Sequence, residues 1–253
     1  MLKGQLNMLE VKCLKKRFGD FEAVKGVSFT VSEGEVLGFL GPNGAGKSTT
    51  MRMITGFLPP TSGTAVIEGH DISSDPIAAK SALGYLPESA PSYRAMTVGD
   101  YLAFVAEIRG CANVKKAVSD AIEKAKLGAR ANQTIETLSK GYRQRTAFAA
   151  AIINDPKVLI MDEPTDGLDP NQKFEVRKMI RRMAEEEGKA VIISTHILEE
   201  VDAVCTHAVI ISDGVAKTGS DADAKISVAE LKKLDPSGDL DVIFRNLTMG
   251  EAK

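Results

Sequence analysis

Residues 41–49 of the 253-residue chain read GPNGAGKST, and four of them match the pattern G-x-x-x-x-G-K-S/T. Glycines in such a loop let the backbone curl, so that successive N–H groups point at phosphate oxygens and the next helix adds its positive N-terminal end. The lysine brings a positive charge to the terminal phosphates, and the serine hydroxyl is a ligand for Mg²⁺. We therefore predict a nucleotide phosphate site formed by Gly41, Pro42, Asn43, Gly44, Ala45, Gly46, Lys47, Ser48 and Thr49.

Four short apolar runs accompany this loop: VLGFL at 36–40, VLIM at 158–161, AVIIS at 190–194 and AVIIS at 208–212. Runs that are apolar on both faces are typical of central strands in a parallel sheet that is covered by helices. These runs predict an α/β protein with a mostly parallel central sheet. A glycine-rich turn without a ligand is the alternative interpretation of the loop. A dinucleotide fold is disfavoured because the order G-x-G-x-x-G is absent.

Two further subdomains are expected beside this sheet. The chain up to residue 31 reads as short strands with turns at 19–20 and 33–34, which predicts a small N-terminal antiparallel β subdomain. Residues 90–140 are rich in amphipathic helical patterns, so we expect an α-helical subdomain inserted between two halves of the sheet.

A long helix is predicted to begin after Asp169, which is a good N-cap and precedes a proline at the first helical position. Gly188 ends it. The final residues are more polar, and we expect a main nucleotide-binding domain over 1–219 and a short extension over 220–253. The predicted buried face of the helix consists of Val176, Met179, Ile180 and Met183.

Composition excludes several classes of protein. The 32 Lys and Arg residues nearly balance 34 Asp and Glu residues, which excludes nucleic-acid binding by bulk positive charge. The longest apolar run, AFAAAII at 147–153, is far shorter than a membrane-spanning helix requires, and the first residues do not resemble a signal peptide. Cys13, Cys111 and Cys205 lack the spacing of a disulfide framework or zinc site, so we expect three buried thiols.

Two adjacent carboxylates, Asp162 and Glu163, follow the apolar run at 158–161. Carboxylates at the end of a buried strand are costly unless a cation or ligand shares their space. We expect Asp162 to ligate Mg²⁺ together with Ser48, and Glu163 to deprotonate the attacking water. His196 follows another strand and would reach the terminal phosphate from the same sheet edge. The alternatives are an exposed acidic strand end and a structural histidine.

Further motifs follow the phosphate loop in a fixed order: GYLPES, LSKGYRQR, VLIMDEP, GLDP and STH. In content and order, over roughly residues 18–196, the chain resembles the nucleotide-binding subunit of an ATP-binding cassette (ABC) transporter. The resemblance implies a P-loop NTPase fold, ATP and Mg²⁺ as ligands, and ATP hydrolysis in which Lys47, Glu163 and His196 are the catalytic residues.

The resemblance also assigns residues outside the phosphate loop. Phe18 would stack on adenine where the family more often has tyrosine, although a core phenylalanine in a strand is the alternative. Ser139 and Gly141 match the signature loop, which faces the γ phosphate of ATP bound to the other protomer. Each site would then be composite. Asp169 would lie in the loop that links the two sites, in addition to capping its helix.

Three positions depart from the usual family pattern. The signature reads LSKGY where LSGGQ is commonest, so Lys140 and Tyr142 replace a glycine and a glutamine. We expect Lys140 to face solvent, with a place near the shared phosphate as the alternative. Glu88 stands where glutamine is usual; it would be a ligand of Mg²⁺ that adds negative charge near the γ phosphate. These departures, with residues 91–104 and 239–250, resemble the ABC-2 type branch, whose partners are export permeases.

The resemblance implies partners and a location as well. We expect a second ATP-binding subunit, as a homodimer, and an integral-membrane permease contacted by the helical subdomain just after Glu88, with no nucleic acid. The subunit would then be cytoplasmic, peripheral at the inner face of the membrane. The alternatives are a soluble ABC ATPase, a nucleotide-dependent regulator and a small-molecule kinase. A soluble ABC ATPase usually has two cassettes or a long coiled coil, and a kinase has no use for LSKGYRQR or GLDP.

Overall fold

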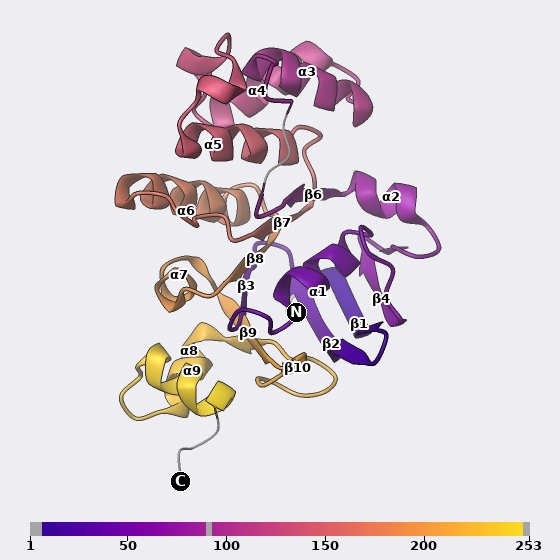
Figure 1. Cartoon of the computed structure of the whole chain (residues 1–253), viewed down its shortest axis with the longest axis vertical. Coiled ribbons are helices and arrows are strands. Elements are labelled where there is room, and N and C mark those ends of the chain that lie inside the picture. Colours follow the sequence, from indigo (N-terminus) through magenta and orange to yellow (C-terminus); the bar gives the residue numbers. More distant parts are fainter. Residues whose placement is uncertain (1–6, 90–92, 250–253) are drawn as a thin grey trace, which may run out of the picture.

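The structure is a computed structural model that describes residues 7–89 and 93–249. Its described strands form two sheets, with helices packed against them (Figure 1). The antiparallel sheet has the order β2 (Phe21–Ser32), β1 (Asn7–Phe18), β4 (Ser62–Ile67) and β5 (His70–Asp71). The central sheet has the order β10 (Val215–Ala216), β9 (His207–Ser212), β3 (Val36–Leu40), β8 (Ala190–Thr195), β7 (Val158–Asp162) and β6 (Leu83–Leu86), and β11 (Ile226–Ser227) pairs with β9.

The central sheet is parallel from β9 through β3, β8 and β7 to β6, and antiparallel where β10 and β11 join β9. Each of the four predicted apolar runs lies in one of these strands, and every residue of β3, β7 and β8 is buried. The predicted fold class is therefore confirmed. Helix α1 (Lys47–Ile54) lies between the two sheets, and α2 (Pro76–Ser81) follows β5.

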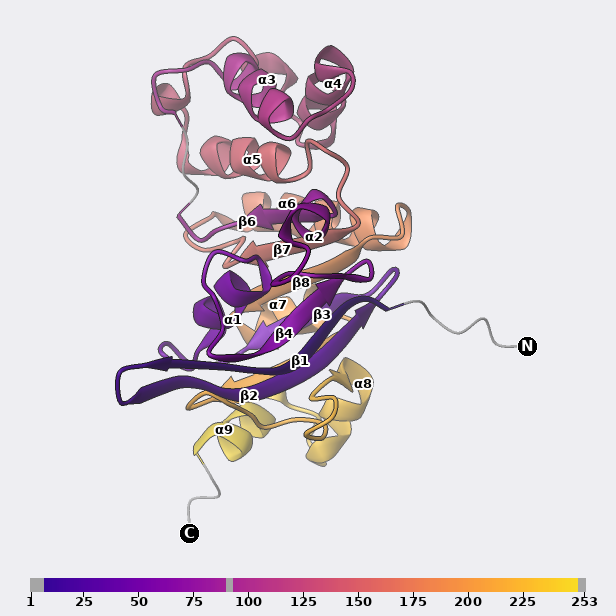
Figure 2. The same ribbon diagram turned by 90° about the vertical axis from the view of Figure 1, so that its right-hand side faces the viewer.

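The N-terminal sheet differs from its prediction in one respect. Strands β1 and β2 each span 12 residues, so the expectation of short strands is wrong. They form a long antiparallel ribbon that extends beyond the rest of the sheet (Figure 2). Register shifts along β1 accompany a left-handed backbone at Cys13 (φ 45°), which is typical of a β-bulge. A bulge adds a residue to one strand without ending it, so β1 continues where the sequence favours two shorter strands.

Helices α3 (Val98–Ile108), α4 (Val114–Lys124) and α5 (Lys140–Ala151) form the helical subdomain, at the top of Figure 1. Two short 3₁₀ turns, Gly128–Arg130 and Ile135–Thr137, connect α4 to α5. The side chains of Thr97, Asn113 and Ser139 accept backbone N–H bonds as N-caps of these three helices. Residues 90–92, at the predicted start of the subdomain, lie outside the described residues.

The predicted helix after Asp169 is α6 (Pro170–Glu185). The Asp169 carboxylate accepts a hydrogen bond from the Gln172 backbone N–H, and Gly188 adopts φ 64° just beyond the helix. The predicted apolar face is buried, as expected. Helix α7 (Leu198–Val204) follows β8.

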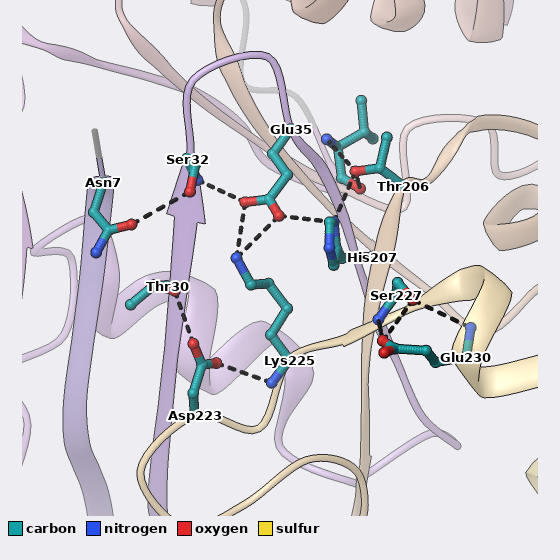
Figure 3. Close-up of polar contacts among 11 residues, drawn as sticks. Asn7, Thr30, Ser32, Glu35, Thr206, His207, Asp223, Lys225, Ser227 and Glu230 are labelled. Atoms are coloured by element: carbon teal, nitrogen blue, oxygen red, sulfur yellow. Dashed lines mark hydrogen bonds and ion pairs between the residues drawn. The ribbon is translucent and has the colours of Figure 1, made fainter. Parts of the chain in front are cut away.

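The end of the chain packs against β9 through α8 (Val228–Leu231), a 3₁₀ turn at Lys232–Leu234 and α9 (Leu240–Met249). A network of polar side chains holds the preceding segment to β2 and to the connection between β2 and β3 (Figure 3). The buried Glu35 carboxylate accepts from Lys225 at 2.9 Å and pairs with His207 at 2.7 Å, and Asp223 accepts from the Thr30 hydroxyl at 2.8 Å. Residue 250, the last of the segment 239–250, lies outside the described residues.

The prediction of three buried thiols is wrong for one of them. Cys13 is exposed, because the bulge in β1 turns it outward, whereas Cys111 and Cys205 are partly buried. Among the described residues, no helix is long and apolar enough to cross a membrane.

Candidate functional site

The loop between β3 and α1 has the curled backbone that its glycines predict. Gly44 and Gly46 have φ values of 82° and 104°, which side chains with a Cβ rarely adopt. A Cβ on Gly46 would lie 2.7 Å from the Ala23 carbonyl oxygen, and one on Gly41 would collide with the Ile211 carbonyl. Backbone therefore surrounds the loop so closely that glycine is required at both positions.

Lys47 lies folded back over this loop. Its Nζ donates to the Gly41 carbonyl at 2.8 Å and to the Pro42 carbonyl at 3.3 Å, and it lies 3.8 Å from Glu163 Oε1. Burial lowers the pKa of Lys47, while the negative charges of Glu163, Asp162 and Glu88 oppose this effect. The buried Lys47 ammonium is therefore positioned to bind an anion at the loop.

Asp162 ends β7 beside the start of α1. The parallel register places it opposite Ser194 of β8, whose hydroxyl donates to Asp162 Oδ1. The Ser48 hydroxyl lies 3.4 Å from the same oxygen. Two hard oxygen donors at this spacing fit Mg²⁺, which keeps waters and binds substrate phosphates in addition to one or two protein ligands. Among the described residues, no three His, Cys, Asp or Glu side chains form a larger metal cluster.

Glu163 and His196 face each other across the ends of β7 and β8. His196 Nδ1 lies 3.0 Å from both carboxylate oxygens of Glu163. Glu163 has a left-handed backbone, φ 49°, which is strained for a residue with a side chain. Its N–H donates to the Ser194 carbonyl at 3.0 Å, and this hydrogen bond holds the turn in place. In this conformation the Glu163 carboxylate lies beside both Lys47 and His196.

Lys47, Ser48, Glu163 and His196 line one cavity of about 640 Å³, whereas Asp162 is not among its lining residues. Phe18 and Phe21 contribute the apolar end, at the tip of the β1–β2 ribbon, where Phe18 is 49% exposed. The Lys16 ammonium lies 5.2 Å from the Phe18 ring centroid. The remaining lining residues are Ala23, Asn43, Gly44, Gly46, Thr49, Glu88 and Asp166.

Three of these lining residues, Phe21, Ala23 and Asp166, were not predicted from the sequence. Phe21 directly follows the turn at 19–20, and a hairpin at that turn places it opposite Phe18. Its position beside Phe18 could therefore have been inferred from the sequence. Asp166 lies in the stretch between Glu163 and Asp169, and nothing in the sequence marks it as facing the cavity.

Ser139 and Gly141 lie apart from this cavity. The Ser139 hydroxyl caps α5, and Gly141 is buried against Gln172, where a Cβ would lie 2.5 Å from the amide carbon. Gly141 instead borders a separate hollow of about 280 Å³ with Tyr142, Arg145, Asp169, Asn171 and Gln172. Within one chain, Ser139 and Gly141 therefore do not line the cavity that contains the phosphate loop.

The two departures in the signature have partners within the chain. Lys140 is exposed, as expected, and its ammonium also pairs with Asp166 at 3.4 Å. The Tyr142 ring lies under the guanidinium groups of Arg130 and Arg145, at 5.1 and 5.6 Å from its centroid.

A glycine-rich loop joining a parallel strand to a helix, with a lysine, a serine and a strand-end carboxylate in contact, defines a P-loop nucleotide-binding protein. The chain belongs to the ABC transporter family, whose model matches residues 24–166. Within that family it is an ATP-binding subunit.

Known proteins similar to the chain agree with this assignment. It is 37% identical over 209 residues to the linearmycin resistance ATP-binding protein LnrL of Bacillus subtilis, covering 82% of this chain and 67% of that protein. It is 36% identical over 213 residues to the Nod factor export ATP-binding protein I of Ralstonia nicotianae, covering 83% and 66%. A solved ATP-binding subunit of an ABC transporter superposes with a TM-score of 0.83 at 27% identity, covering 95% of this chain and 99% of that chain.

Proposed function

We propose that this chain hydrolyses ATP with Mg²⁺ and thereby drives an export permease of ABC-2 type. The observation that supports this most strongly is the contact of Glu163 with both Lys47 and His196 in one cavity. A scaffold that only binds nucleotide has no need of a carboxylate oriented in this way. Export is supported by the relatives, which are a linearmycin resistance protein and a Nod factor export protein.

Each residue has a distinct role in the proposed reaction. Lys47 neutralises charge on the terminal phosphates, and the loop N–H groups bind them. Glu163 accepts the proton of the attacking water, and His196 holds that carboxylate in position. Ser48 and Asp162 would hold Mg²⁺, with Glu88 as a further oxygen at the rim, and the ion would neutralise phosphate charge. Phe18 would stack on the adenine at the apolar end.

A homodimer would complete each site. Ser139 and Gly141 lie outside the cavity formed by Lys47 and Glu163, so the signature loop of one chain is available to a second chain. The capped N-terminus of α5 is a suitable anion site for a γ phosphate. Closing two chains around two ATP molecules, and opening them after hydrolysis, would be the mechanical output.

The permease is proposed to dock on the helical subdomain, at the inner face of the membrane. Tyr93 is exposed and meets Phe104 edge-on, with ring centroids 5.3 Å apart, and Ile108 is exposed on the same helix as Phe104. Apolar side chains gathered on a surface mark an interaction site. We also propose that residues 1–219 form the ATPase domain and residues 220–253 a short extension. Asp223 and Lys225 attach this extension to β2 and to the β2–β3 turn.

Docking can be tested by crosslinking Tyr93→Cys to a co-expressed permease from the neighbouring reading frame. The background needs Cys13→Ser, because Cys13 is exposed. Asp221→Cys, exposed on the C-terminal segment, is the matched control. Crosslinks at position 93 and none at 221 are expected; the reverse pattern would remove the helical subdomain as the docking surface.

Phosphate release separates the proposed ATPase from a nucleotide-dependent regulator. Steady release by the purified chain with ATP, abolished by EDTA and restored by Mg²⁺, is expected. Binding of ATP without release, alone and with the permease, would favour the regulator. A chain that releases phosphate and associates with no membrane protein would favour a soluble ABC ATPase.

A further inference from the structure

Lys140 joins the signature helix to the rim of the nucleotide cavity within one chain. Its Nζ lies 3.4 Å from Asp166 Oδ2, and both side chains are 54% exposed. Asp166 lines the cavity that contains Lys47 and Glu163. Gly167 leaves the necessary space, because a Cβ at this position would collide with the Lys140 ammonium. The pair thus places a cation against a carboxylate that faces the nucleotide site.

The charge of the cavity explains why such a cation matters. Its lining includes the carboxylates of Glu88, Glu163 and Asp166, whereas Lys47 is the single lysine or arginine among its described lining residues. A nucleoside triphosphate brings several further negative charges into the same space. Like charges at this range repel, and each uncompensated carboxylate weakens anion binding.

The position of Lys140 in α5 is unfavourable for the helix itself. Lys140 is the first residue of α5, and the first turn contains no acidic residue. A positive charge at a helix N-terminus opposes the helix dipole. Asp166 offsets this from another element, and Gln144 of α5 donates to the Pro164 carbonyl at 3.2 Å, which holds the helix beside the same loop. Tertiary contacts, and not the helical preferences of α5, therefore bring Lys140 and Asp166 together.

We propose that Lys140 is a positioning residue for nucleotide binding: it neutralises Asp166 at the cavity rim and so lowers the repulsion between this chain and a nucleoside triphosphate. Lys140 acts through Asp166 and need not touch the nucleotide of its own chain. The proposal rests on the proposed function only in requiring that the chain binds ATP.

The test measures the dissociation constant of a fluorescent ATP analogue with Mg²⁺ for the purified chain, at low and at high salt. Lys140→Met should weaken binding roughly threefold to tenfold at about 20 mM salt, the size of one screened surface charge acting on a polyanion. The effect should nearly vanish at about 0.5 M salt, where the Debye length is only a few ångströms. Lys140→Arg should bind as the unchanged chain does.

A second variant isolates the compensation of charge. Lys140→Met combined with Asp166→Asn should restore binding to within about twofold of Asp166→Asn alone, because no uncompensated carboxylate is left. Lys116→Met is the matched control: it also removes one lysine of a surface ion pair, with Asp120 on α4, away from the cavity. It should leave binding unchanged.

Three results would contradict one of the two proposals. If Lys140→Met binds like Lys116→Met at low salt, Lys140 does not neutralise Asp166 and the proposal fails. If the double variant stays as weak as Lys140→Met, Lys140 acts on the nucleotide or on folding, and the proposal also fails. Absence of binding by the unchanged chain contradicts the proposed function instead, so the two failures are distinguishable.

Discussion

Glu35 offers a stability prediction whose size can be worked from the structure. Its side chain is 6% exposed and accepts hydrogen bonds from Lys225 and from the Ser32 N–H, while His207 pairs with it at 2.7 Å. Burial by itself raises the pKa of Glu35, but His207, Ser32 and Lys225 outweigh it and lower the pKa to about 2 from an ordinary 4.5.

This difference in pKa converts into a free energy of unfolding. The two values differ by about 2.5, and each pKa unit corresponds to about 1.4 kcal/mol, which gives about 3.5 kcal/mol. Because the folded pKa is depressed, this stabilisation is present above pH 4.5 and disappears as the pH falls toward 2. Glu35→Gln, which leaves Lys225 and His207 without an anion, should therefore lower stability by about 2 to 4 kcal/mol at neutral pH.

The assay is urea unfolding followed by circular dichroism between pH 7 and pH 2.5. The Glu35→Gln variant should have a lower midpoint at pH 7 and a shallower loss of stability on acidification. Limited proteolysis should cut it first in the segment around Asp223, which the network holds to β2. Glu199→Gln is the control, since Glu199 also belongs to an ion pair, with Arg177, but is 77% exposed, and it should change stability by no more than about 0.5 kcal/mol. Equal midpoints and parallel acid profiles for Glu35→Gln and the unchanged chain would refute the reasoning.

Three further predictions concern the nucleotide cavity. Gly46→Ala should abolish ATP binding and cost about 1 to 3 kcal/mol of stability, because φ 104° and the Ala23 carbonyl leave no room for a Cβ; calorimetry and thermal unfolding measure both. Phe18→Ala should weaken ATP binding about threefold to tenfold while Phe18→Tyr leaves it unchanged, and equal affinities for all three chains would exclude stacking. Asp162→Asn should raise the Mg²⁺ concentration needed for half-maximal hydrolysis about tenfold or more, and an unchanged Mg²⁺ titration would contradict its role as a ligand.

Local stereochemistry made much of the site predictable. The phosphate loop is recognisable because its glycines must adopt backbone angles that other residues rarely reach, and the helix after Asp169 because its cap and proline are adjacent in sequence. The buried strands were predictable for a related reason: a strand covered on both faces must be apolar throughout.

Contacts between distant residues were not predictable. Glu35 and Lys225 are 190 residues apart, and Lys140 and Asp166 are 26 apart, so no local pattern joins either pair. The exposure of Cys13 follows from a bulge in β1, which depends on pairing with β2 and β4. In each case, tertiary packing and not local preference sets the outcome.

Replacement of Glu163 by Gln tests the central claim most directly, since the amide keeps the shape of the side chain but cannot accept the proton of water. Phosphate release should fall by about 100-fold or more, with ATP affinity unchanged, and size-exclusion chromatography in ATP should show a more persistent dimer. Near-normal hydrolysis by Glu163→Gln would contradict the assignment of Glu163 as the base, and with it the proposed mechanism.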